Sequence, residues 1–125
     1  MMEIVNIRQD HTQKLGNFLD FEQMRYLSAE MHMNRAAVWA VYEKEEVVMM
    51  AVVRLDGDIL DGGAIARLRI RAEGKNKTFR GAPSKKLVVL AKDWVGSRAK
   101  YMTIDTNAFM PSMDTEEQTI HRMEL

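Results

Sequence analysis

A run of cations is the feature of this 125-residue chain that most clearly suggests chemistry. Arg67, Arg69 and Arg71 alternate along a β-prone segment, so their side chains lie on one face of the predicted strand. A helix then begins at Pro83, and the free N–H groups and macrodipole at a helix start attract anions. The loop between strand and helix is rich in glycine and cationic residues: Gly74, Lys75, Lys77, Arg80 and Gly81. The segment therefore predicts an anion-binding site, and the plainer interpretation is a solvated basic face.

The overall charge is balanced, with 18 basic and 18 acidic residues, but the distribution is uneven. Residues 67–100 hold 11 of the 18 Lys and Arg residues and only two acids, Glu73 and Asp93. This asymmetry favours an anionic ligand or partner for the basic block. The acidic remainder suits a cationic amine as substrate, either a small molecule or a lysine on a protein.

Phosphate is an anion that the loop suits by residue type. Arg80 offers a bidentate fork to phosphate oxygens, and Lys75 and Lys77 offer point charges. Binding of single-stranded nucleic acid uses aromatic side chains on which bases stack. Phe79 is the only aromatic residue in the loop, which argues against nucleic acid as the partner.

Composition places the chain among globular proteins, with 46% hydrophobic and 29% charged residues. The length fits one domain that spans residues 1–125. The longest apolar run, residues 47–53, is far shorter than the roughly 20 residues that cross a bilayer. The first residues lack the pattern of a secretory signal. We therefore expect a cytoplasmic protein with no membrane partner.

The residue types exclude several kinds of chemistry. The chain has no cysteine, so it has no disulfide, no thiolate zinc ligand and no cysteine nucleophile. His11, His32 and His121 lack the spacing of metal ligands, and we expect no metal site. No Gly-x-Ser-x-Gly sequence marks a serine nucleophile at a strand-to-helix turn.

Periodicity predicts a mixed α+β domain. Apolar residues at helical spacing predict helices at residues 13–19, 21–32 and 83–95, with Asp20 as the N-cap of the second. β-Branched and alternating residues predict strands at residues 3–8, 37–43, 47–55, 64–71 and 101–105. Residues 114–118 suit one helical turn, and residues 119–125 suit either a short edge strand or a tail. Helices interspersed among strands that are mostly antiparallel define the α+β class.

This order of elements, with a cationic loop entering the central helix, resembles the GNAT superfamily of N-acetyltransferases. The resemblance covers residues 3–106, with residues 38–43 as the second strand, 47–53 as the third and 101–106 as the fifth. It implies a mostly antiparallel mixed sheet with helices on both faces. It also implies transfer of an acetyl group from acetyl-CoA to an amine.

Residues 71–90 stand where the superfamily binds the pyrophosphate of acetyl-CoA through backbone amides. The resemblance assigns cofactor binding to eight residues: Arg71, Gly74, Lys75, Lys77, Arg80, Gly81, Ala82 and Ser84. The sequence departs from the family motif at residues 79–84, where Pro83 replaces the second small residue and removes a backbone donor. The helix that carries a tyrosine general acid in such proteins is not recognisable after Asn107.

These departures keep two alternatives open. One is a catalytically inactive GNAT-like binding module, encoded by a phage or mobile element, that acts through a protein partner. The other is an anion- or nucleic-acid-binding α+β domain unrelated to CoA. A closing strand missing from the fold would leave a sheet edge unpaired, and pairing with a second chain would cover it, so we expect a homodimer.

Acetyl transfer to an amine needs a base that takes the ammonium proton and an acid that protonates the thiolate. Glu43 and Asp105, at the ends of predicted strands, are the candidate bases, and Tyr42 is the candidate acid. Each also has a structural interpretation, since a strand tyrosine usually packs half-buried. Without a cysteine for a covalent intermediate, the transfer would be direct, within a ternary complex.

Overall fold

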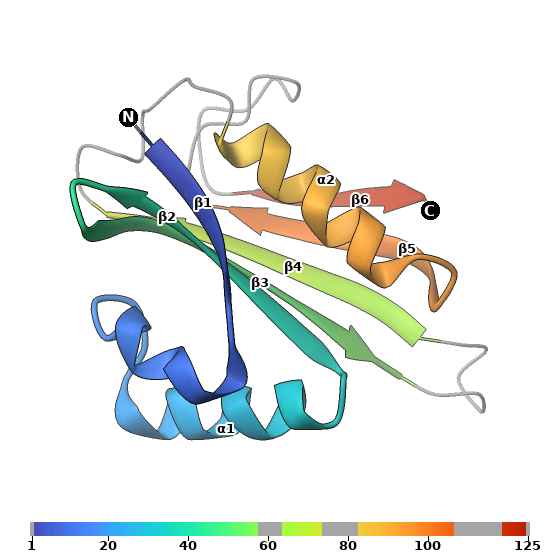
Figure 1. Ribbon diagram of the computed structural model, residues 1–125. Helices are drawn as coiled ribbons and strands as arrows, with labels where there is room; N and C mark the ends of the chain where they lie inside the picture. Colours follow the sequence, from blue (N-terminus) through green and yellow to red (C-terminus); the bar gives the residue numbers. More distant parts are fainter. Residues whose placement is uncertain (1, 58–63, 74–82, 107–118, 125) are drawn as a thin grey trace.

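The protein is described by a computed structural model that covers residues 2–57, 64–73, 83–106 and 119–124 (Figure 1). Six strands form one sheet in the order β1-β2-β3-β4-β5-β6. All neighbouring strands are antiparallel except β4 and β5, which are parallel. The strands are β1 (Met2–Ile7), β2 (Ala36–Glu43), β3 (Glu46–Asp56), β4 (Ala64–Ala72), β5 (Ala99–Thr106) and β6 (Thr119–Glu124). The predicted α+β class is confirmed.

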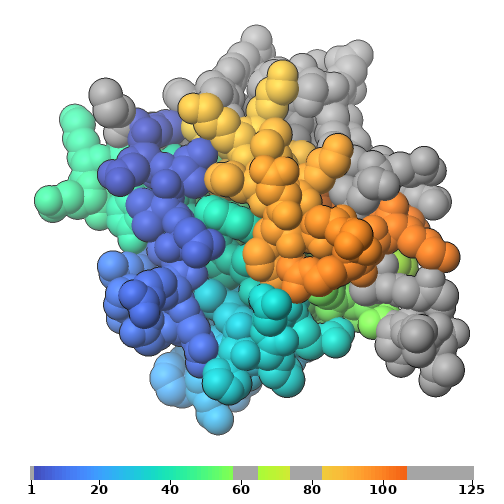
Figure 2. Space-filling view, turned by 45° about the vertical axis from the view of Figure 1, so that its right-hand side comes forward, coloured from blue at the N-terminus to red at the C-terminus, as the bar shows by residue number. Residues whose placement is uncertain are grey.

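Helices cover both faces of this sheet, as expected (Figure 1). The helical segments are the 3-10 helix η1 (Gln9–Leu15), α1 (Phe21–His32) and α2 (Pro83–Val95). Leu87, Ala91 and Val95 of α2 pack on one face, over a core drawn from β2 to β5. Leu15 of η1 and Leu27 of α1 pack on the other face, over residues of β1, β2 and β3. Figure 2 shows the face that carries α2, with the yellow-to-orange atoms of α2 beside the blue strand β1.

The side chains on the two faces of strand β4 differ strongly in burial. Ala66, Leu68 and Ile70 are fully buried against the α2 layer. Arg67 and Arg69 are exposed on the opposite face, since successive side chains of a strand point to opposite sides of a sheet. The predicted alternation of the arginines is therefore confirmed. Arg71 continues the same row and is half-buried.

Local signals fixed both α-helices where the sequence predicts them. The Asp20 carboxylate accepts a hydrogen bond from the Gln23 N–H at 2.8 Å, and the Gln23 side chain accepts one from the Asp20 N–H at 2.9 Å. This capping box satisfies two backbone donors at the start of α1. Helix α2 begins at Pro83, whose missing N–H costs nothing there, and is followed by Gly96 in the left-handed region at a φ of 56°.

The first predicted helix differs from the structure in type and position. Helix η1 covers Gln9–Leu15 rather than residues 13–19, and His11 departs from helical geometry within it. Burial of Leu15, which has no exposed surface, anchors its end in the α1 layer. Phe18 and Leu19 then pack against the same layer from the turn before α1.

The C-terminal residues resolve an alternative left open by the sequence. Thr119–Glu124 forms β6 and pairs antiparallel with β5, so the edge strand is confirmed and the tail is wrong. The helical turn predicted at residues 114–118 lies outside the described residues. Since β6 covers the edge of β5, the outer strands of the described sheet are β1 and β6. The homodimer stays a prediction.

Candidate functional site

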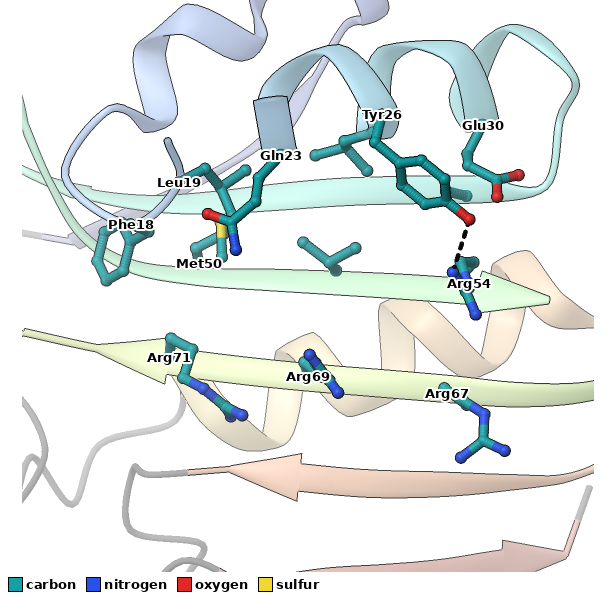
Figure 3. A pocket seen from close by; sticks show the side chains of 13 residues that line it. Phe18, Leu19, Gln23, Tyr26, Glu30, Met50, Arg54, Arg67, Arg69 and Arg71 are labelled. Carbon is teal, nitrogen blue, oxygen red and sulfur yellow. Dashed lines mark hydrogen bonds between the residues drawn. The ribbon is translucent and has the colours of Figure 1, made fainter. Parts of the chain in front are cut away.

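A pocket of about 330 Å³ opens between α1 and the sheet, and we call it the arginine groove (Figure 3). One wall is apolar and comes from Leu27 of α1, the turn before it and strand β3: Phe18, Leu19, Leu27, Met50 and Val52. The other wall is cationic and comes from β3 and β4: Arg54, Arg67, Arg69 and Arg71. Its volume lies in the range of small-molecule sites.

The register of the sheet builds the cationic wall. Arg54 of β3 lies directly opposite Arg67 of β4, and Val52 lies opposite Arg69. Alternation places all of these on the α1 face. Figure 3 shows α1 above β3, with the three β4 arginines in a row beyond it. The groove therefore forms where the α1 layer gives way to an uncovered cationic strand.

At the N-terminal end of β4, one carboxylate serves two arginines. Arg67 donates from Nε to Asp56 Oδ2 at 2.9 Å, and Arg54 Nη2 lies 3.4 Å from the same oxygen. The hydrogen bond from Arg67 is the main cause that holds the pKa of the Asp56 carboxyl below its ordinary range, against a smaller opposing effect of burial. Asp56 therefore stays negatively charged beside the row of arginines at neutral pH.

At the C-terminal end of β4, Arg71 bridges two strands. Its guanidinium donates to the backbone oxygens of Ile70 (2.9 Å) and Asp105 (3.0 Å), and to Asp105 Oδ2 at 3.0 Å. The same carboxylate lies 3.8 Å from Arg69 Nε. The structure thus brings together Arg71, predicted for the cofactor, and Asp105, predicted as a base. Asp105 is largely buried, with 16% of its side chain exposed.

Three polar residues of α1 reach the groove without having been predicted as site residues. Arg54 donates to the Tyr26 hydroxyl at 3.0 Å (Figure 3). The Glu30 carboxylate beside the phenol is the main cause that raises the pKa of Tyr26, and the nearby Arg54 charge opposes this. Oε2 of Glu30 is buried without a hydrogen-bond partner in the described part of the chain, and Arg35 Nε lies 3.6 Å away. Gln23 also lines the groove.

The sequence indicates only part of the cluster formed by Tyr26, Glu30 and Arg54. Tyr26 and Glu30 are four residues apart on a predicted helix, so they share one helix face. Arg54 joins them only through the packing of α1 on β3, across 28 residues of chain. Helical spacing could therefore suggest the pair, but not its cationic partner.

Tyr42 and Glu43 lie away from the groove. They end β2, where their partners are Glu3 and Met2 of β1. Tyr42 is half-buried and packs against the core layer of α1, as its structural interpretation expects. Three strand spacings separate β2 from β5, which makes roughly 14 Å at ~4.8 Å each. The structure therefore does not bring Tyr42 and Glu43 together with Asp105.

The predicted cofactor residues fall into two groups. Six lie outside the described residues: Gly74, Lys75, Lys77, Arg80, Gly81 and Ala82. The Ser84 side chain is buried, with Oγ 3.9 Å from Met49 Sδ, so its hydroxyl faces the sheet. Of the donors of Ser84, only its backbone N–H is therefore left to bind an anion at the start of α2.

The start of α2 fits a phosphate group in its described part. Pro83 has no N–H, but the N–H groups of Ser84 and Lys85 have no partner within the helix. The first turn holds no acid, and Lys85 and Lys86 are exposed there. Two cations at the positive end of a helix dipole repel it, and a bound anion removes that penalty.

Within residues 2–57, 64–73, 83–106 and 119–124, no cluster of three or more His, Asp or Glu residues is arranged to hold a metal ion. No helix in the described chain has the length and apolar character needed to cross a membrane.

The sequence has no matching protein-family model and no match among curated proteins. Solved structures match by fold. A GNAT-family acetyltransferase from Streptococcus pneumoniae has a TM-score of 0.62 at 13% identity, over 83% of this chain and 73% of that one. A predicted acetyltransferase from Clostridium acetobutylicum, solved with acetyl-CoA, has a TM-score of 0.63 at 10% identity, over 83% and 80%.

A third match is glucosamine-6-phosphate N-acetyltransferase from Arabidopsis thaliana, with a TM-score of 0.58 at 13% identity, over 95% of each chain. These likenesses define the class by its architecture: the chain has the GNAT fold. The fold expected from the sequence resemblance is therefore confirmed.

Proposed function

We propose that the protein is a GNAT-like acyltransferase that transfers an acetyl group from acetyl-CoA to an amine by direct transfer. The observation that carries this proposal is the position of the arginine groove within a GNAT fold. Its Arg71 end lies at the C-terminal end of β4, from which the chain leads to the start of α2. Ser84 at the start of α2 contacts Met49, which pairs with Ala72 at this end of β4. A pocket for an acceptor and a helix start suited to phosphate therefore lie near the same end of β4, on opposite faces of the sheet.

The cofactor would be held at the helix start and the loop before it. The N–H groups of Ser84 and Lys85 would donate to the pyrophosphate, with the Lys85 and Lys86 charges nearby. Lys75, Lys77 and Arg80 would neutralise phosphate charge, and Gly74, Gly81 and Ala82 would contribute backbone N–H groups. Acetyl-CoA, when bound, supplies an activated thioester carbonyl.

The groove would hold and orient the acceptor. Its apolar wall, with Leu27 and Met50, would exclude water from one side of the bound amine. Of the three residues predicted for acid–base chemistry, Asp105 alone adjoins the groove, through Arg71 and Arg69. We propose it as the group that accepts the proton of an amine bound at this end. Tyr42 and Glu43 remain candidates that would require a larger acceptor, since they lie across the sheet.

Calorimetric titration with acetyl-CoA tests the proposal. We expect wild type to bind, and the variant Lys77→Ala with Arg80→Ala to lose about 10-fold or more in affinity, because two charge-assisted contacts are removed. Lys92→Ala is the matched control, since it removes an exposed cation from the last turn of α2. No binding at millimolar acetyl-CoA, or equal binding by the double variant, would contradict the proposal.

Turnover separates the proposal from its alternatives. Wild type should acetylate members of a panel of amines, as detected by release of free thiol. Binding of acetyl-CoA without acetylation of any amine would favour the inactive binding module. Salt-dependent retention on DNA without acetyl-CoA binding would favour a nucleic-acid-binding domain.

A further inference from the structure

We propose that the arginine groove recognises an acceptor that carries an anionic group, a phosphate or a carboxylate, in addition to its amine. This inference rests on the proposed function, because it names the class of substrate that the same pocket would take. Arg69 is the residue that we assign to the anion.

The arginine groove carries a surplus of positive charge. Four arginines, at positions 54, 67, 69 and 71, share the carboxylates of Asp56 and Asp105. Each of these carboxylates neutralises one charge, and Glu30, which also lines the groove, is paired with Arg35, so the described side chains leave two positive charges in excess. On β4 the arginines recur every second residue, which spaces them by roughly 7 Å. Such a concentration of one sign along a pocket wall attracts anions into the pocket.

Arg69 is an exposed member of the arginine row whose guanidinium is not held by a hydrogen bond in the described part of the chain. Its side chain is 70% exposed, and its Nε lies 3.8 Å from Asp105 Oδ2, too far for a hydrogen bond. It makes no hydrogen bond to another residue in the described part of the chain. Arg71, by contrast, is held by three hydrogen bonds. Arg69 therefore has its planar fork of donors available at the centre of the row.

Gln23 of α1 offers a hydrogen-bond donor on the side of the groove away from β4. The Gln23 side-chain oxygen accepts the hydrogen bond from the Asp20 N–H in the capping box. This fixes the orientation of the amide and leaves its NH₂ group as a donor. Figure 3 shows the Gln23 nitrogen directed into the groove, across from the β4 arginines. An anion in the groove would thus meet donors from both walls.

The alternative of a merely solvated basic face explains the groove less well. Helix α1 lies over one side of this surface, and the pocket between them has a volume of about 330 Å³. That volume holds a small molecule, whereas a nucleic-acid strand needs an open track with stacking platforms. The apolar wall opposite the arginines would contact the non-ionic body of the acceptor.

Calorimetry with three matched probes tests the inference. Ethanolamine, O-phosphoethanolamine and β-alanine share an amine on a two-carbon chain and end in a hydroxyl, a phosphate and a carboxylate. We expect wild type to bind at least one of the two anionic probes about 10-fold or more tightly than ethanolamine. A preference for phosphoethanolamine assigns the groove to phosphate, and a preference for β-alanine assigns it to carboxylate.

Arg69→Gln should reduce that preference to about 3-fold or less, because it removes the charge from an exposed side chain without disturbing the core. Lys92→Gln, an exposed cation on α2, should keep it. An anionic preference that is absent in wild type, or unchanged in Arg69→Gln, would overturn the inference. The acetyl-CoA titration tests the proposed function separately. If wild type binds acetyl-CoA but shows no preference for the anionic probes, the result contradicts this inference and not the proposed function.

Discussion

The two faces of β4 carry consecutive residues of one strand and have opposite environments. Ala66, Leu68 and Ile70 have no exposed surface and pack beneath α2. The side chains of Arg67 and Arg69 are 52% and 70% exposed on the other face. One strand can therefore anchor the core and present a charged site, because its side chains alternate.

The two helical layers explain why the faces differ. Helix α2 places Leu87, Ala91 and Val95 over the sheet, in one core cluster with residues of β2 to β5. The core cluster beneath α1 draws its buried residues from β1, β2 and β3 but none from β4. The β4 positions on this face therefore do not have to pack in an apolar core, and arginines occupy them.

The largest expected effect comes from the buried face. Leu68→Ala should lower the free energy of unfolding by about 3 kcal/mol, because it removes a fully buried side chain and leaves a cavity. Arg69→Ala, the next residue on the opposite face, should change it by no more than about 0.5 kcal/mol. Urea denaturation monitored by tryptophan fluorescence measures both. Comparable losses in the two variants would mean that the faces are not energetically distinct.

A smaller effect is expected at the junction of β4 and β5. Asp105→Asn should cost about 1.5 kcal/mol, because Arg71 loses a charge-assisted hydrogen bond in a largely buried setting. Asp10→Asn is the matched control, since Asp10 is exposed and its ion pair with Arg8 spans 3.8 Å. The same unfolding assay compares them.

If Asp105 is also the base, Asp105→Asn should abolish most acetyl transfer while acetyl-CoA binding persists. An unchanged rate of transfer would remove Asp105 from catalysis and leave it as the residue that positions Arg71.

The smallest expected effect is a pH dependence at the other end of the arginine row. The hydrogen bond from Arg67 lowers the folded-state pKa of Asp56, so its contribution to stability is present above the ordinary aspartate range and is lost as pH falls below about 4. Because Asp56 is 40% exposed, solvent screening limits this contribution to about 0.5 kcal/mol.

Arg67→Gln should therefore be slightly less stable than wild type at neutral pH, and the difference should be smaller at about pH 3. Urea denaturation at both pH values provides the test. A difference that grows on acidification would contradict the assigned sign.

Features encoded locally were predictable from the sequence. The Asp20 capping box and the Pro83 start fixed α1 and α2, and alternation placed Arg67, Arg69 and Arg71 on one face. These signals act within a few residues and need no knowledge of packing. The GNAT fold followed from the order of such elements.

Features made by distant contacts were not predictable. Arg71 meets Asp105 across 34 residues, and Arg54 meets Tyr26 across 28. The groove depends on these contacts and on where the α1 layer ends, which no local pattern encodes. Tyr42 and Glu43 illustrate the limit, because strand ends that looked equivalent in the sequence lie on well-separated strands.

The central claim is tested most directly by urea unfolding of wild type, Leu68→Ala and Arg69→Gln, each with and without the anionic amine, O-phosphoethanolamine or β-alanine, that wild type binds more tightly. A ligand that binds the folded state stabilises it by ~1.4 kcal/mol at roughly ten times its dissociation constant. Leu68→Ala should lose stability yet keep the full increment from this ligand. Arg69→Gln should keep its stability and lose most of the increment. An equal increment in wild type and Arg69→Gln would contradict a ligand-binding role for the arginine face of β4.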